Sequence, residues 1–143
     1  ALAGARVGYA MGNAALIADL NTIKYSTNPY NVSRLDAAAA CVALDEDAYY
    51  MENCRTIAEN RAWTTQQLQK LGFTVTASKS NFVFARTERI SGLALYEKLK
   101  ARGILIRHFE KPRIRAYNRI TVGTREQMQA LIAAITAILE EQT

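Results

Sequence analysis

The spacing of apolar residues changes at residue 72, and this change predicts where helices give way to strands. Before Gly72, apolar residues recur every three or four positions over residues 48–71, which places them on one face of a helix. Gly72 itself is a favourable residue for ending a helix. After it, apolar and polar residues alternate over residues 73–77 and 81–86, as in half-buried strands. Only a Ser-Lys-Ser segment separates these two runs, so we expect a hairpin.

Serine and threonine residues mark the starts of three further helices. Ser33 is followed three residues later by Asp36, and Thr124 by Gln127, which is the capping-box pattern. Ser91 precedes another apolar segment with helical spacing. We therefore expect helices to begin directly after all three residues.

Two more alternating segments, residues 104–109 and 118–122, predict a third and a fourth strand. From residue 32 onward, the predicted order is helix, helix, strand, strand, helix, strand, strand, helix. This order is typical of an α/β (α+β) domain whose helices pack on one side of a small, largely antiparallel sheet. We predict two parts: residues 1–31, a strand at 7–11 and a loop that end a larger domain, and residues 32–143, a small C-terminal α/β domain.

Composition and charge narrow the class of protein. Half of the 143 residues are apolar and 22% are charged, which is typical of a globular protein. No apolar run is long enough to cross a membrane and no signal peptide is recognisable, so we expect a cytoplasmic protein with no membrane partner. The net charge is +5, but the basic residues are dispersed, and Phe82 and Phe84 share a face that we interpret as core. We therefore expect no nucleic-acid partner.

No group of residues predicts a metal site or a catalytic residue. Cys41 and Cys54 lie in helical sequence and form no Cys-x-x-Cys pair, so we expect buried free thiols. His108 is the only histidine, and packing or a satisfied hydrogen bond is the simplest role for it. We find no set of nucleophile, base and orienting residue.

Three arginines are candidates for binding anions. Arg6 lies between Gly4 and Gly8, where the absence of side chains lets a phosphate approach closely, although a surface arginine beside a tight turn has the same pattern. Arg119 lies in a predicted strand, where it could hold a carboxylate or form a cross-strand ion pair. If Ile104 and Ile106 face the core, Arg107 points the other way.

Five segments together resemble one family. The segments LAGARVGYAMG, PYNVS, SNFVFAR, GILIRHF and NRITVGTREQM occur in the order and spacing of histidinol-phosphate aminotransferases. The resemblance implies the fold of aspartate aminotransferase and pyridoxal 5'-phosphate as cofactor. It also implies that histidinol phosphate and 2-oxoglutarate are converted to imidazole acetol phosphate and glutamate in histidine biosynthesis, by a cytoplasmic homodimer.

The resemblance assigns roles to matching residues. Arg6 matches the arginine that binds the cofactor phosphate, Arg119 the one that holds the substrate α-carboxylate, and Arg107 one that holds the phosphate of histidinol phosphate. Tyr30 and Asn31 match a loop that borders the pocket. The lysine that binds the cofactor covalently would directly precede Ala1. We therefore expect a C-terminal fragment that is inactive alone and does not bind the cofactor.

Other functions stay open. The single segments also fit aromatic and other amino-acid aminotransferases, and phosphothreonine decarboxylases. The segment FEKPRIRAY, between two of the candidate arginines, is richer in lysine and arginine than in many relatives, which leaves the choice of substrate open. A non-catalytic α/β binding domain is the alternative from a different class.

Overall fold

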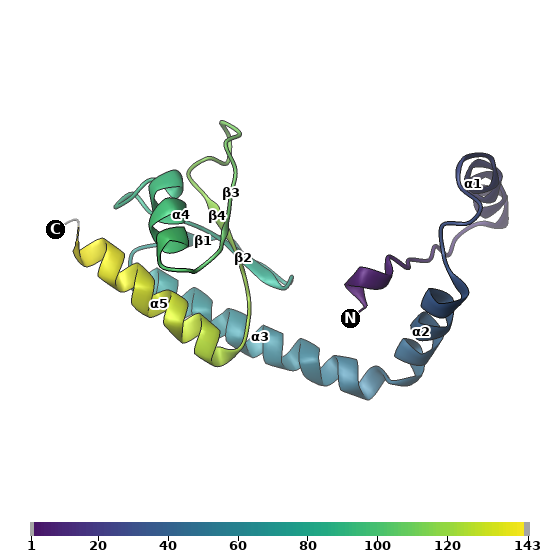
Figure 1. The fold of residues 1–143 in the computed structure, drawn as a ribbon, viewed down its shortest axis with the longest axis horizontal. Helices are drawn as coiled ribbons and strands as arrows, with labels where there is room; N and C mark the ends of the chain where they lie inside the picture. The colour runs from purple at the N-terminus through teal and green to yellow at the C-terminus, as the bar shows by residue number, and fades with distance from the viewer. Residues whose placement is uncertain (1, 142–143) are drawn as a thin grey trace. The chain divides into compact units, whose positions relative to one another are not determined.

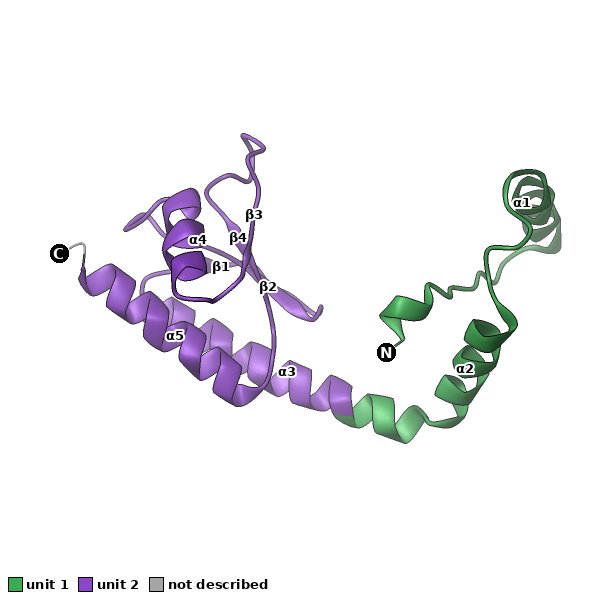
Figure 2. Ribbon diagram, viewed as in Figure 1, with its two compact units in different colours: residues 1–52 green, residues 53–143 purple. Residues whose placement is uncertain are grey.

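The computed structural model describes residues 2–141, which form two compact units, residues 2–52 and residues 53–141 (Figure 2). The division falls inside a long helix, α3 (Asp47–Lys70). Our domain boundary after residue 31 concerns the whole protein and stays a prediction. None of the helices within residues 2–141 is long and apolar enough to cross a membrane.

The first unit consists of helices that bury little. It contains a short 3-10 helix, η1 (Ala3–Ala5), followed by α1 (Ala14–Thr27), α2 (Arg34–Asp45) and the start of α3. Neither α1 nor α2 has a buried residue. The predicted strand at 7–11 is wrong, because a strand needs a partner for its backbone groups and residues 2–52 contain no strand.

The two cysteines correct a second prediction. Cys41 in α2 and Cys54 in α3 are free thiols, as expected, but both are exposed rather than buried. Helical spacing identifies residues that share a face, but it does not say whether anything covers that face.

The second unit is a four-stranded antiparallel sheet with three helices (Figure 1). The strand order is β1-β2-β4-β3, and each neighbouring pair is antiparallel. The predicted hairpin is confirmed by the pairing of β1 with β2. The third strand has two residues rather than the predicted six. The elements beyond α3 are β1 (Thr74–Val75), β2 (Phe82–Arg86), α4 (Gly92–Ala101), β3 (Arg107–His108), β4 (Asn118–Thr121) and α5 (Arg125–Glu140).

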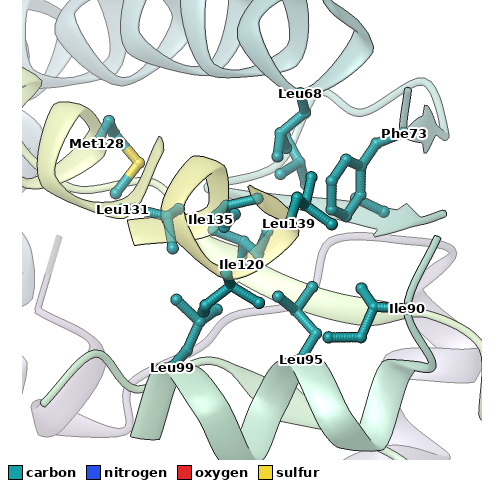
Figure 3. Packing of buried hydrophobic residues seen from close by; sticks show 13 residues of the cluster. Leu68, Phe73, Ile90, Leu95, Leu99, Ile120, Met128, Leu131, Ile135 and Leu139 are labelled. Carbon is teal, nitrogen blue, oxygen red and sulfur yellow. The ribbon is translucent and has the colours of Figure 1, made fainter. Parts of the chain in front are cut away.

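One hydrophobic core holds this second unit together, and it confirms the predicted α/β fold class (Figure 3). Leu68 enters it from α3, and Ile120 enters it from the sheet. Leu95 and Leu99 come from α4, and Ile135 comes from α5. Each of these five side chains is at most 2% exposed. Because α3, α4 and α5 all contribute to the cluster, the described helices of this unit pack on one and the same face of the sheet.

The predicted helix starts are confirmed. The side-chain oxygens of Ser33, Ser91 and Thr124 each accept a hydrogen bond from the backbone N–H three residues later. At Thr124 the capping box is complete, since the Gln127 side chain accepts a hydrogen bond of 2.9 Å from the Thr124 backbone N–H. At Ser33 the hydroxyl instead donates to the Asp36 carboxylate.

Candidate functional site

The candidate site lies on the face of the sheet opposite to the one that α3, α4 and α5 of the second unit cover. Along β2, Val83 and Ala85 are buried, whereas Phe82 and Phe84 are only half-buried because strand alternation points them to the opposite side. Our interpretation of Phe82 and Phe84 as core residues is therefore wrong. The smaller Val83 and Ala85 fill the space under the helices.

The pairing of the strands aligns two arginines with these rings. Phe84 lies directly opposite Arg119, and Arg119 lies directly opposite Arg107, so the three form one row across β2, β4 and β3. Both arginines are exposed. The outward direction predicted for Arg107 is confirmed, because Ile104 and Ile106 pack against the core.

Each of the two guanidinium groups lies close to at least one aromatic ring. The Cζ of Arg119 lies 5.3 Å from the ring centre of Phe82 and 6.0 Å from that of Phe109. The Cζ of Arg107 lies 5.5 Å from the ring centre of Phe109. These are distances at which a cation is attracted to the negative face of a ring. We call Phe82, Phe84, Arg107, Phe109 and Arg119 the arginine–aromatic face.

The arginine–aromatic face has positive charge that no ion pair among residues 2–141 neutralises. Directly opposed like charges on a sheet are unfavourable. In the described part of the chain, neither Arg107 nor Arg119 has a carboxylate oxygen within 4.0 Å. By contrast, Arg86 at the end of β2 is bound to Glu88 at 2.7 Å. The arrangement therefore suits an external anion, because guanidinium groups bind carboxylates and phosphates with two parallel hydrogen bonds.

His108 has the structural role expected for it. Its Nδ1 lies 3.2 Å from Oδ1 of the buried Asn118, whose Nδ2 donates to the Gly92 carbonyl at 2.9 Å. Because the Asn118 amide nitrogen is the donor to Gly92, its oxygen is the acceptor, and the His108 Nδ1 carries the proton. His108 also stacks on Tyr96 at 6.2 Å. It belongs to the helix-covered side of the sheet, away from Arg107.

Arg6 lies in the first unit, directly after η1. Its side chain is exposed, and its backbone has a φ of 55°, in the left-handed region. A Cβ atom added to Gly4 or Gly8 would meet no atom within 4 Å, so the space around Arg6 is open. No carboxylate pairs with Arg6 among the described residues. Its role in binding a phosphate stays a prediction.

Tyr30 and Asn31 follow α1 and are exposed, Tyr30 by 92%. Their predicted place at the border of a pocket stays a prediction.

Sequence reasoning missed Phe109 and the role of Phe82. The sequence does indicate the direction of the two rings, because Phe82, Phe84 and Arg86 are two residues apart and therefore point to the same face of β2. A charged residue on that side argues against a buried face.

The chain is similar in sequence to a known family of enzymes. The profile of the family "Aminotransferase class I and II" matches residues 1–135. The chain is 45% identical to the histidinol-phosphate aminotransferase of Clostridium beijerinckii, covering 96% of this chain and 38% of that protein. It is also 45% identical to histidinol-phosphate aminotransferase 1 of Bradyrhizobium diazoefficiens, over 97% of this chain and 40% of that one. The chain thus spans about two-fifths of the length of these relatives.

Solved structures agree with the sequence relatives. Histidinol-phosphate aminotransferase from Sinorhizobium meliloti, determined in complex with pyridoxal-5'-phosphate, has a TM-score of 0.86 at 26% identity, covering 99% of this chain and 39% of that one. L-threonine-O-3-phosphate decarboxylase from Porphyromonas gingivalis has a TM-score of 0.81 at 26% identity, over 97% of this chain and 43% of that one. The family match over residues 1–135 shows that this chain belongs to the class I and II aminotransferases.

Proposed function

We propose that the protein containing this chain is a pyridoxal-phosphate-dependent aminotransferase that exchanges an amino group between histidinol phosphate and 2-oxoglutarate. The observation that carries the proposal is the pair of opposed arginines without carboxylate partners, Arg107 and Arg119, on the arginine–aromatic face. The names of the sequence relatives support the choice of substrate.

The chemistry of the substrates matches two separate cations. Histidinol phosphate carries a phosphate ester, whereas glutamate and 2-oxoglutarate carry carboxylates. Both kinds of anion accept paired hydrogen bonds from a guanidinium group. We assign the phosphate to Arg107 and the α-carboxylate to Arg119. Because histidinol phosphate has no carboxylate, the role of Arg119 applies to glutamate, to 2-oxoglutarate and to any amino-acid substrate.

The described residues around Arg6 fit the phosphate group of pyridoxal phosphate. The Arg6 guanidinium is exposed, it has no carboxylate partner in the described chain, and the space beside Gly4 and Gly8 is open. When bound, the cofactor would stabilise the negative charge that develops at the substrate α-carbon. Arg6 would anchor the cofactor, and Arg107 and Arg119 would hold the substrate.

A decarboxylase acting on a phosphorylated amino acid is the second candidate. It is supported by the TM-score of 0.81 to L-threonine-O-3-phosphate decarboxylase. Such a substrate carries both a phosphate and a carboxylate, which also suits Arg107 and Arg119. Product analysis separates the two functions, since only the decarboxylase releases carbon dioxide and only the aminotransferase converts 2-oxoglutarate to glutamate.

The Arg107→Ala variant of the full-length enzyme tests the assignment of the phosphate. We expect kcat/KM for histidinol phosphate to fall about 30-fold, which is a loss of transition-state stabilisation on the order of 2 kcal/mol, because a charge-assisted contact to the phosphate is lost. The loss with phenylalanine, which has no phosphate, should be less than threefold. The control is Arg86→Ala, which removes an arginine already paired with Glu88 and should change neither value by more than about twofold.

Two results would contradict the proposal. Equal losses on both substrates for Arg107→Ala would remove the phosphate role and favour an aromatic aminotransferase. A wild-type enzyme that transfers no amino group with any substrate of the panel would favour the decarboxylase or a non-catalytic binding domain.

The setting and the assembly are also part of the proposal. We place the protein in the cytoplasm, as a homodimer that acts on small molecules. Support for the compartment comes from Cys41 and Cys54, which are exposed free thiols of the kind that persists in reducing surroundings.

A further inference from the structure

We propose that Phe109 is a positioning residue that holds Arg107, and to a smaller extent Arg119, ready for the anions of the substrate. This inference rests on the proposed function and assigns a role to a residue that itself carries no charge or hydrogen-bonding group. It follows from the way in which the rings of the arginine–aromatic face are shared between the two guanidinium groups.

The two arginines depend on Phe109 to different degrees. Phe109 is the one ring of the described chain within cation–π distance of Arg107, at 5.5 Å. Arg119 contacts Phe109 at 6.0 Å but has a second and closer ring, Phe82, at 5.3 Å. Loss of the Phe109 ring would therefore leave Arg107 without an aromatic contact, whereas Arg119 would keep one.

The Phe109 ring is itself held in place. It lies edge-on to Phe84, with ring centres 6.2 Å apart and planes at 68°, a favourable aromatic geometry. Phe84 in turn stacks on Tyr117 at 4.6 Å. Because Phe84 is on the paired strand β2, the sheet holds Phe84 in place. Phe84 in turn holds the Phe109 ring, which Arg107 contacts.

A fixed ring matters because a free arginine side chain has many rotamers. Holding a long side chain in its binding conformation before the ligand arrives lowers the entropy lost on binding. The ring also attracts the guanidinium groups of Arg107 and Arg119, which the strand register brings together although they repel each other. Phe109 thus keeps the phosphate-binding cation on the face without neutralising its charge.

The experiment compares Phe109→Leu with Tyr117→Leu in the full-length enzyme. Both variants remove one ring from the same side of the sheet, but Tyr117 contacts neither Arg107 nor Arg119 and reaches Phe109 only through Phe84. For Tyr117→Leu we therefore expect kcat/KM for histidinol phosphate to fall by less than about threefold. For Phe109→Leu we expect kcat/KM for histidinol phosphate to fall about tenfold, mainly through KM, as loss of cation–π contacts implies. The loss for glutamate should be about threefold or less, because Arg119 keeps Phe82.

Two further variants separate positioning from a general structural effect. Phe109→Tyr retains the ring face and should restore kcat/KM for histidinol phosphate to within about twofold of wild type. In an Arg107→Ala background, Phe109→Leu should have almost no additional effect on histidinol phosphate, because the arginine that it positions is already absent. A structural role would instead add its loss to that of Arg107→Ala.

The outcomes distinguish this inference from the proposed function. If wild type and the Arg107 variant behave as proposed but Phe109→Leu matches Tyr117→Leu, the positioning role is wrong and the function stands. Equal losses on both substrates, or no rescue by Phe109→Tyr, would also overturn the positioning role. If wild type does not use histidinol phosphate, the proposed function fails, and the positioning role that rests on it is overturned with it.

Discussion

At the scale of single residues, neighbouring positions on β3 and β4 serve opposite sides of the sheet. Arg107 and Arg119 point outward, whereas the adjacent His108 and Asn118 point toward the helices. If the pairing between β3 and β4 slipped by one residue, the side chains of the slipped strand would move to the opposite face of the sheet. The buried Asn118 opposes such a shift, because its amide is bound both to His108 and to the Gly92 carbonyl. Its hydrogen bonds thus help to keep Arg119 on the open face.

Arg119→Lys tests the role of this outward arginine in the full-length enzyme. Lysine keeps the positive charge but cannot form the two parallel hydrogen bonds that orient a carboxylate. We expect kcat/KM for glutamate to fall, with a loss of transition-state stabilisation on the order of 2–4 kcal/mol. Both a lower kcat and a higher KM should contribute, because the α-carbon of glutamate is misplaced.

Steady-state kinetics with glutamate and with histidinol phosphate measure this effect. Histidinol phosphate, which has no carboxylate, serves as the internal control and should lose less. A variant that loses activity only through the KM for histidinol phosphate would show that Arg119 binds the phosphate instead.

Local alternation was enough to predict some residue directions and failed for others. The outward direction of Arg107 follows from Ile104 and Ile106, which have a clear preference for the core. The direction of Phe82 and Phe84 could not be decided by hydrophobicity, because Val83 and Ala85 are apolar too. The helices leave room for the smaller pair, and this is a property of packing between distant segments.

At the scale of elements, helix starts are well predicted because capping is a local interaction. Thr124 caps α5, which contributes five buried residues to the second unit. We expect Thr124→Ala to lower the free energy of unfolding by about 1 kcal/mol, because the first-turn N–H group of Gln127 loses its acceptor. Urea denaturation followed by circular dichroism measures the change.

Ser33→Ala is the matched control for this prediction. It removes the same kind of cap from α2, a helix that buries no residue. The main unfolding transition, which reports on the core of the second unit, should therefore move by less than about 0.3 kcal/mol. A larger shift for Ser33→Ala than for Thr124→Ala would contradict this account of which helices carry stability.

Strand lengths were predicted less well than helix starts. Residues 104–109 alternate over six positions, yet only Arg107 and His108 pair with β4. Residues 7–11 have strand-like composition but no partner strand within the described part of their unit. Pairing depends on a distant segment being available, and a single-sequence pattern contains no information about that segment.

At the scale of the whole chain, stability and candidate chemistry are unevenly distributed. All residues of the hydrophobic cluster fall between Leu68 and Leu139. The first unit instead exposes many large apolar side chains, such as Leu16, Ile23 and Leu44. The chain spans about two-fifths of the length of its histidinol-phosphate aminotransferase relatives.

Removal of residues 1–31 tests this distribution. Because α1, the helix that this deletion removes, contributes no buried residue, its apolar contacts supply little of the energy that drives folding. We expect the chain 32–143 to unfold in one cooperative transition, with a free energy of unfolding within about 0.5 kcal/mol of that of the chain 1–143. Removing residues 125–143 instead deletes α5 with its five buried residues and should abolish the transition. Loss of cooperativity on removal of residues 1–31 would show that the first segment belongs to the same folding unit, and would move the domain boundary toward the N-terminus.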